Sequence, residues 1–411
     1  MSSQDFNHFL LLASIALILS HFLGHLFSKI KQPRVMAEIS VGLILGPSLF
    51  GFFFPAAQSW LFPDSMTSLL ALLKELGLIL LMFCSGAELR HLDPRKHKKS
   101  CTYGIILGIG LPALFGGLSL QFLDLSSLIG ELGDNGKLKL AIILSMAVTS
   151  IPVISRILLD LNLLKSKFAE QVLSIALIED FILYALLNVV LSKNSEAQNP
   201  ISSLFIHIAI SSLFLGAVIF WRERIFLFFR SFAKKTTTES NHLYLTFILA
   251  TLFIIIYLTN YLGIVSMISA FCAGMVLGSG TSDRVEELIE TVRQFSFAIF
   301  IPFYFFMVGY RINLARDFNF GWFLFFFLFS SFLKTLGGYL TGKLSGESRF
   351  RSWALGLTLN ARGGPGIVIA TAAYDQKIIS NTLFTTLIIT ALMTSSLAGS
   401  FLDKYKAKLA D

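Results

Sequence analysis

The chain has 411 residues, of which 55% are hydrophobic and only 14% are charged. Soluble globular proteins carry about 25% charged residues, and here the apolar residues form blocks of roughly 20, the length that crosses a bilayer. This composition excludes an ordinary soluble domain and indicates a polytopic membrane protein. The net charge of +8 is explained by basic residues in cytoplasmic loops. We therefore expect the chain to contact a lipid bilayer, and we do not expect it to bind nucleic acid.

Taken in chain order, the apolar blocks predict an all-α protein with about thirteen transmembrane helices. The predicted spans are residues 7–29, 33–53, 68–88, 101–123, 138–160, 168–192, 200–221, 242–258, 262–280, 292–311, 320–344, 352–374 and 381–404. With the N-terminus outside and the C-terminus cytoplasmic, most loop Lys and Arg residues fall on the cytoplasmic side, as the positive-inside rule requires. We therefore predict a multi-pass protein of the inner membrane.

Three features outside the spans complete the outline. Residues 281–294 carry charges at helical spacing and form either a short amphipathic helix at the cytoplasmic surface or a solvated linker. The cysteines and histidines fit no metal or redox spacing, and no nucleophile lies near a base in the sequence, so neither an enzyme nor a cofactor is expected. The last span reaches almost to the final residue, so no soluble regulatory domain is expected.

Four charged residues lie near the middle of predicted spans. Glu179 and Asp180 are central in span 168–192, Lys334 is central in span 320–344, and Arg362 is central in span 352–374. A charge at the bilayer centre costs about 2.5–3.5 kcal/mol on insertion scales, so these groups must be paired, hydrated or neutralised. A purely structural salt bridge is the alternative, but apolar replacements of such bridges are usually as stable.

Two spans also contain residues that interrupt helices. A Thr-Ser-Ile-Pro run lies in span 138–160, and an Arg-Gly-Gly-Pro-Gly run lies in span 352–374. Proline removes a backbone donor and glycine loosens a helix, and unpaired backbone groups survive in a bilayer only inside protein or beside a cavity. The residues concerned are Thr149, Ser150, Pro152, Gly363, Gly364 and Pro365.

The two interrupted spans are the fifth and the twelfth, so they cross the membrane in opposite directions. The first six and the last six spans would then be inverted repeats, with span 200–221 as the linker. Paired broken helices in inverted halves mark the midplane site of a transporter. Their half-helix ends carry partial charges that need compensation, and Lys334 and Arg362 are the candidates for this role.

Six segments carry motifs that resemble the sodium/proton and potassium/proton exchanger family, in the family's order. The resemblance covers nearly the whole chain and is to the branch shared by bacterial cation:proton antiporters, glutathione-gated potassium efflux systems and plant endomembrane exchangers. The segments are residues 32–51, 77–89, 147–161, 303–314, 333–337 and 359–364.

The resemblance implies that Asp180 is the carboxylate at which a proton and a transient Na⁺ or K⁺ ion compete. Thr149 and Ser150 would supply further oxygen ligands. Glu179 stands where the family carries Asp, Asn or Gln, and an acid there together with Lys334 resembles the electrogenic type. A one-for-one exchange with a permanent Glu179–Lys334 pair is the alternative.

The resemblance also implies an architecture. Residues 7–100 and 242–311 would form a scaffold that makes a homodimer, and residues 101–192 and 320–404 would form the moving core. The main alternatives are a sodium-coupled solute symporter of similar architecture and a potassium efflux antiporter. A channel or a membrane-embedded hydrolase or transferase is a further alternative.

Overall fold

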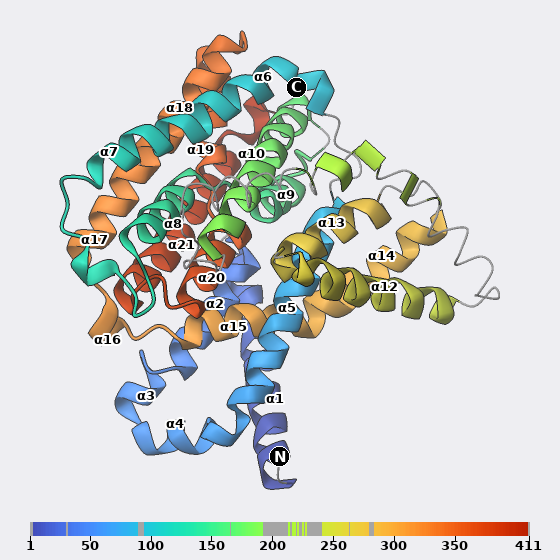
Figure 1. Cartoon of the computed structure of the whole chain (residues 1–411), viewed down its shortest axis with the longest axis vertical. Coiled ribbons are helices and arrows are strands. Elements are labelled where there is room, and N and C mark those ends of the chain that lie inside the picture. Colours follow the sequence, from blue (N-terminus) through green and yellow to red (C-terminus); the bar gives the residue numbers. More distant parts are fainter. Residues whose placement is uncertain are drawn as a thin grey trace. The chain divides into compact units, whose positions relative to one another are not determined.

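The computed structural model describes residues 3–29, 32–88, 94–164, 166–191, 241–262, 264–278 and 283–409, with a few helical residues between 213 and 227. Apart from one isolated bridge between Ile129 and Ile379, the regular structure of these residues is helical (Figure 1). The all-α prediction is therefore confirmed for this part of the chain. Most of the predicted seventh span, 200–221, lies outside the described residues.

Eight helices of the described residues are long and apolar enough to cross a membrane. They span Asp5–Lys29, Arg34–Phe53, Pro55–Glu88, Lys98–Ser119, Asn135–Leu159, Val285–Tyr310, Phe320–Leu344 and Asn381–Lys408. The apolar helices Leu245–Tyr261 and Ser266–Gly278 are shorter. The count of thirteen spans stays a prediction.

The chain divides into two compact units. The first contains Met1–Thr67, Leu92–Leu183 and Phe305–Asp411, and the second contains Ser68–His91 and Tyr184–Tyr304. Every residue that the sequence marks as a candidate site residue belongs to the first unit. The predicted division into scaffold and core stays a prediction.

The first unit begins with α1 (Ser3–Lys29), α2 (Arg34–Leu45), α3 (Phe50–Phe53) and α4 (Pro55–Leu61). Next, α6 (Lys98–Tyr103) passes through two π-helical segments, Gly104–Ile109 and Pro112–Gly116, into α7 (Gly117–Ser119). Then come α8 (Asn135–Ala147), α9 (Ile151–Asp160) and α10 (Lys167–Leu191), of which the part through Leu183 is in this unit.

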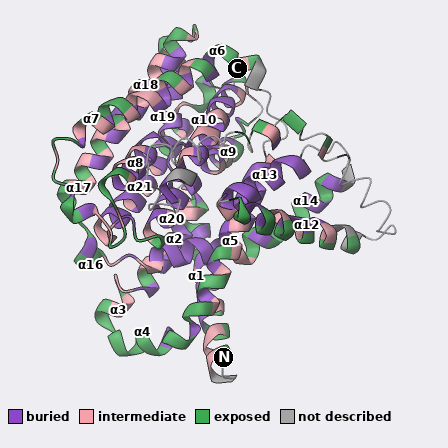
Figure 2. Cartoon of the chain, in the orientation of Figure 1, coloured by how far each residue is buried: buried purple, intermediate pink, exposed green. Residues whose placement is uncertain are grey.

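The same unit closes with the C-terminal helices. These are α16 (Leu314–Asp317), α17 (Phe320–Phe325), which continues through the π-helical Phe326–Ser330 into α18 (Ser331–Leu344), then α19 (Arg349–Leu359), α20 (Gly364–Asp375) and α21 (Asn381–Tyr405). The inner helices α8, α20 and α21 are largely buried, whereas α3 and α4 are largely exposed (Figure 2).

Glycines let helices of this unit approach closely. A Cβ on Gly338 of α18 would lie 2.6 Å from the Cα of Gly356 in α19. A Cβ on Gly42 of α2 would lie 2.8 Å from the Cα of Gly309 in α15 (Ile301–Tyr310). Small residues at such crossings are typical of membrane helices, because close backbone packing replaces the hydrophobic driving force.

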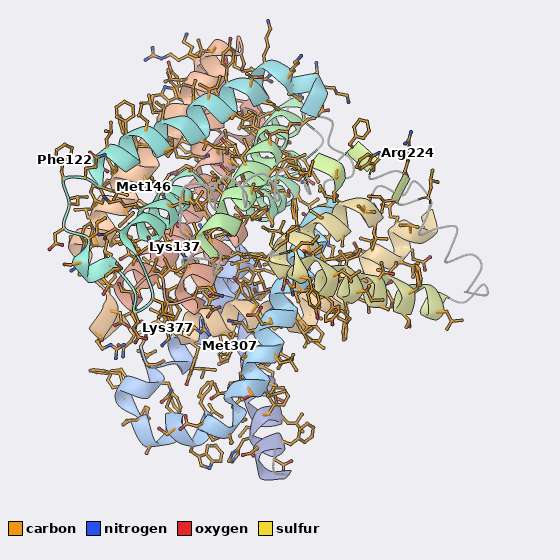
Figure 3. All side chains as sticks on the ribbon, viewed as in Figure 1. Phe122, Lys137, Met146, Arg224, Met307 and Lys377 are labelled. Atoms are coloured by element: carbon orange, nitrogen blue, oxygen red, sulfur yellow. The ribbon has the colours of Figure 1, made fainter. Side chains whose placement is uncertain are left out.

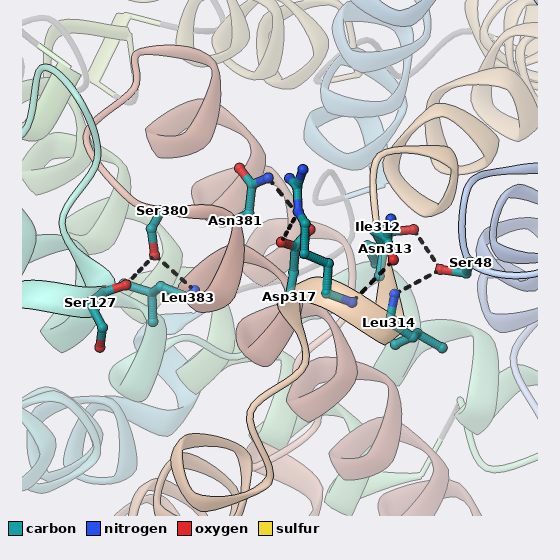
Figure 4. A network of polar contacts seen from close by, with 10 residues as sticks. Ser48, Ser127, Ile312, Asn313, Leu314, Asp317, Ser380, Asn381 and Leu383 are labelled. Atoms are coloured by element: carbon teal, nitrogen blue, oxygen red, sulfur yellow. Dashed lines mark hydrogen bonds and ion pairs between the residues drawn. The ribbon is translucent and has the colours of Figure 1, made fainter. Parts of the chain in front are cut away.

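Polar contacts join the ends of several helices in this unit (Figure 4). The hydroxyl of Ser48 donates to the carbonyl of Ile312 at 2.5 Å and accepts from the amide of Leu314 at 3.1 Å. The carboxylate of Asp317 accepts from Arg316 at 2.9 Å and from the amide of Asn381 at 3.4 Å. The segment after α2 and the start of α21 are thereby both tied to the region of α16.

The second unit contains α5 (Thr67–Glu88), α12 (Asn241–Tyr261), α13 (Ser266–Gly278) and α14 (Asp283–Phe295). The predicted separation of the eighth and ninth spans matches the interruption between α12 and α13. The charged segment 281–294 is helical over its described residues, and α14 continues through the π-helical Ser296–Phe300 into α15. The linker alternative is therefore wrong for residues 283–294.

Candidate functional site

Two helices of the first unit are interrupted in the middle. One ends as α8 at Ala147 and resumes as α9 at Ile151, and the other ends as α19 at Leu359 and resumes as α20 at Gly364. Pro152 and Pro365 each lie in the first turn of the second half. A first-turn residue needs no N–H donor for the helix, so each proline starts a half-helix without leaving a broken bond inside one.

The end of α8 is covered by two cations. The guanidinium of Arg362 donates to the carbonyl of Met146 at 3.0 Å, and the ammonium of Lys334 donates to the carbonyl of Ala147 at 2.6 Å; Met146 is labelled in Figure 3. The last carbonyls of a helix have no partner within it, and positive charge there is stabilised by the helix dipole. Lys334 and Arg362 therefore lie where charge compensation is needed.

Lys334 has a complete set of acceptors. Its ammonium donates to Glu179 Oε2 at 2.7 Å, to the Ala147 carbonyl, and to the Gly108 carbonyl at 3.1 Å. An ammonium has three N–H donors, so all of them are used. Both side chains of the Lys334–Glu179 ion pair are fully buried.

Thr149 connects the two interruptions. Its Oγ1 lies 2.6 Å from Glu179 Oε2 and 2.9 Å from the carbonyl of Leu359, the last residue of α19. A hydroxyl has one proton, so it donates to only one of these acceptors at a time. When Glu179 is protonated, the carboxyl can donate to Thr149 while Thr149 donates to Leu359.

Asp180 differs from Glu179 in having no such partner. Its side chain is only 1% exposed, and its Oδ1 makes no hydrogen bond to any described residue. Lys334 interacts with it electrostatically but donates its hydrogen bonds elsewhere. An isolated buried carboxylate is very costly, so Asp180 needs either a proton or a bound cation.

The remaining predicted residues lie around the same point. Ser150 caps α9, because its Oγ accepts from the amide of Val153 at 3.4 Å. A Cβ on Gly363 would collide with Val153 and lie 2.8 Å from Ser150 Oγ, whereas a Cβ on Gly364 would meet only Pro152, at 3.9 Å. Gly363 is therefore a second point, besides the Thr149–Leu359 contact, at which the two interruptions touch.

Some residues of the site were not predicted from the sequence. Ser330 accepts from the Arg362 guanidinium, and Ser395 donates to the Arg362 carbonyl at 3.0 Å. Asn360, in the second interruption, has a buried Oδ1 without a hydrogen-bond partner among the described residues. Ser330 lies one helical turn before Lys334 in the sequence, and this spacing could have identified it. The backbone carbonyls that accept from Lys334 and Arg362 gave no signal in the sequence.

The site also offers oxygen atoms that make no hydrogen bond to the described residues. Among the residues that the structure describes, no group of three or more His, Cys, Asp or Glu side chains is placed to hold a metal ion. These oxygen atoms are Asp180 Oδ1 and Asn360 Oδ1, and oxygen ligands of this kind suit hard cations.

A family profile described as "Sodium/hydrogen exchanger, transmembrane" matches residues 11–405. The chain belongs to the sodium/hydrogen exchanger family. The exchanger-family assignment confirms the resemblance inferred from the six sequence motifs, and with the apolar helices it makes the chain a multi-pass membrane protein.

Two relatives illustrate the extent of the similarity. The chain is 28% identical to K(+)/H(+) antiporter 1 of Saccharomyces cerevisiae, over 96% of this chain and 46% of the relative. It is 27% identical to the Na(+)/H(+) antiporter NhaS4 of Synechocystis sp., over 96% of this chain and 97% of the relative. This exchanger-family chain thus spans about half the length of several curated relatives, the yeast protein among them.

The fold is shared with a solved structure. The sodium proton antiporter MjNhaP1 from Methanocaldococcus jannaschii matches with a TM-score of 0.69 and 16% sequence identity, over 99% of this chain and 98% of that one. The predicted antiporter fold, with its two interrupted helices, is therefore confirmed.

Proposed function

We propose that this exchanger-family chain is a secondary antiporter that exchanges protons for a monovalent cation, Na⁺ or K⁺. The observation that carries the proposal is Asp180, a buried carboxylate with an unpartnered oxygen, beside an ion pair at the crossing of two interrupted helices. A carboxylate in this position has to bind a proton or a cation, and it cannot hold both at once. Competition for one group is the chemistry of antiport.

The neighbouring residues have separate roles in this proposal. Asp180 holds the proton or the cation, and oxygens of Thr149 and Ser150, with water, complete the ligands of the ion. Lys334 and Arg362 stay on the end of α8, where they fix the interrupted helix. Thr149 can follow the protonation of Glu179, because its hydroxyl lies within hydrogen-bond distance of both Glu179 and Leu359.

The transport cycle follows from the inverted repeats. Residues 101–192 and 320–404 would move as a core past a scaffold formed by residues 7–100 and 242–311, and exchange access to Asp180 between the two sides. The scaffold would form a homodimer in the inner membrane, with the N-terminus outside and the C-terminus cytoplasmic. The names of the relatives, one a K⁺/H⁺ antiporter and one a Na⁺/H⁺ antiporter, support both cations as candidates.

The test is direct. The purified chain is reconstituted in liposomes that contain a pH-sensitive dye, and NaCl, KCl or LiCl is added in turn. Wild type should move protons in response to at least one cation, and Asp180→Asn should insert and fold but lose this flux. Asp64→Asn, a change at an exposed aspartate, is the matched control and should keep it. Wild-type rates in Asp180→Asn would refute the proposed role of Asp180.

A further inference from the structure

The third acceptor of Lys334 is unusual, because Gly108 does not lie at a helix end. It lies inside the helix that runs from α6 through two π-helical segments into α7. In a regular α-helix the carbonyl of residue 108 would accept the N–H of residue 112. Residue 112 is proline, which has no N–H.

We propose that Pro112 is a positioning residue for Lys334: by removing the α-helical (i+4) donor of Gly108, it leaves that acceptor position open to the ammonium. Lys334 then has two backbone acceptors, each supplied by an interrupted hydrogen-bond ladder. One is the end of α8 at Ala147 and the other is the gap that Pro112 makes at Gly108. The functional part of this inference rests on the proposed antiport.

The packing around Gly108 places the carbonyl at the site. A Cβ on Gly108 would collide with Glu179 Oε1, and a Cβ on Gly337 of α18 would lie 3.2 Å from the Cα of Gly108. The helix of Gly108 therefore fits between α10 and α18 only because glycine stands at these crossings. The Gly108 carbonyl meets Lys334 at the point where the three helices converge.

The register along α10 supports the same placement. Ser100 accepts from Gln171 at 2.9 Å, and one turn further along each helix a Cβ on Gly104 would lie 2.6 Å from Ile175 Cγ2. The next turn brings Gly108 against Glu179. The two helices thus run parallel in one register, and that register fixes which carbonyl faces Lys334.

The arrangement has a consequence for the transport cycle. When Glu179 is protonated or turns away, Lys334 keeps its bonds to Ala147 and Gly108. The two backbone bonds therefore hold the ammonium at the end of α8 whether or not Glu179 contacts it. If residue 112 had an N–H, a regular α-helix would use the Gly108 carbonyl as its acceptor. Only the Ala147 carbonyl would then be available to Lys334 without competition.

A thermal-stability cycle tests the inference without measuring transport. Pro112→Ala restores an N–H at this position. In the protein that keeps Lys334, this change should lower the melting temperature by a few degrees. In a Lys334→Met background, which has no ammonium to lose, the same change should have little effect or should stabilise. Pro302→Ala is the control, since Pro302 is also buried in a helix after a π-helical segment. Equal shifts for Pro112→Ala in both backgrounds would overturn the proposal.

A transport experiment separates the missing donor from the proline ring. The charged groups that face Lys334 are Glu179, Asp180 and Arg362, and all are unchanged by a substitution at Pro112. In liposomes, Pro112→Ala should change the pH dependence of the antiport, because the restored N–H competes with Lys334 for the Gly108 carbonyl. Replacement of Pro112 with lactic acid, which has no N–H and no ring, should keep the wild-type profile.

The outcomes are distinct. If the lactic acid variant behaves like Pro112→Ala, the ring and not the missing donor matters, and the inference fails. If wild type shows no cation-driven proton flux, the proposed function fails, while the melting-temperature cycle still decides whether Pro112 positions Lys334.

Discussion

The two interrupted helices differ in what covers their ends. At the end of α8, two cations contact the last carbonyls, with Lys334 on Ala147 and Arg362 on Met146. At the end of α19, the neutral hydroxyl of Thr149 is the one hydrogen-bond donor to the Leu359 carbonyl among the residues that the structure describes. The two interruptions are thus alike in their backbone and unlike in their electrostatics.

This difference indicates which end is fixed and which is adjustable. Two cationic side chains on one helix end hold it by the helix dipole and by hydrogen bonds together. A hydroxyl with a single proton, shared between Leu359 and Glu179, changes its bond when the carboxylate changes its protonation. We infer that protonation is felt at the end of α19, while the end of α8 stays constant.

The largest effect is expected from removing a cation from the fixed end. Lys334→Ala leaves Glu179 buried and unpaired and leaves the Ala147 carbonyl uncovered, which should cost about 3–5 kcal/mol of unfolding free energy. The double change with Glu179→Gln should recover part of that loss. Thermal melting in detergent measures both, with the exposed Lys343→Ala, in the same helix, as the control.

This prediction has a clear contrary result. If the two single changes at Lys334 and Glu179 simply add in the double variant, the residues are not energetic partners. Lys334 would then stabilise the end of α8 independently of Glu179.

The next effect concerns the contact between the interruptions. Gly363→Ala places a methyl group against Val153 and Ser150, and overpacking of this kind costs about 1–3 kcal/mol. Gly364→Ala meets only Pro152, at van der Waals distance, and should be nearly neutral. Melting temperatures and liposome flux of the two variants compare adjacent glycines directly, and equal losses would mean that the interruptions do not touch at Gly363.

The adjustable end is tested at Thr149. Thr149→Val keeps the shape but removes the hydroxyl, so the Leu359 carbonyl loses a bond at a cost of about 1–3 kcal/mol. Thr149→Ser keeps the hydroxyl and should preserve most of the stability. If transport couples to this bond, Thr149→Val should also change the pH dependence of proton flux, whereas Thr149→Ser should not. Identical pH profiles in both variants would contradict an adjustable end.

The sequence predicted the parts of this comparison that depend on residue type. Charged residues in the middle of apolar spans, and runs of helix-breaking residues, can be recognised directly in the sequence. The sequence therefore predicted the two interruptions and the charged residues Glu179, Asp180, Lys334 and Arg362. Which carbonyl each cation meets depends on helix register and crossing, and no single residue encodes it. Neither Gly108 nor Pro112 was singled out from the sequence, and only the structure shows the Gly108 carbonyl 3.1 Å from the Lys334 ammonium.

The smallest effect is expected where the half-helices are joined far from their interruptions. The segment before α8 pairs with the turn after α20, since Gly130 and Leu132 donate backbone bonds to Ile378 and Lys377, at 2.9 and 3.0 Å. An exposed ion pair, with Lys377 2.5 Å from Glu131, lies beside this pairing. Exposed pairs contribute little, so the backbone bonds should dominate here.

The pH dependence of this junction has a definite sign. The hydrogen bond and charge of Lys377 lower the pKa of Glu131, so the pair stabilises the fold above the unfolded glutamate pKa of about 4.3 and loses this contribution as the pH falls below it. Wild type should melt slightly higher than Glu131→Gln at pH 7, and the difference should disappear as the pH falls below the lowered pKa of Glu131. A difference that persists or grows in acid would show that the charge of Glu131 does not support the junction, and that the backbone pairing alone joins α8 to α20.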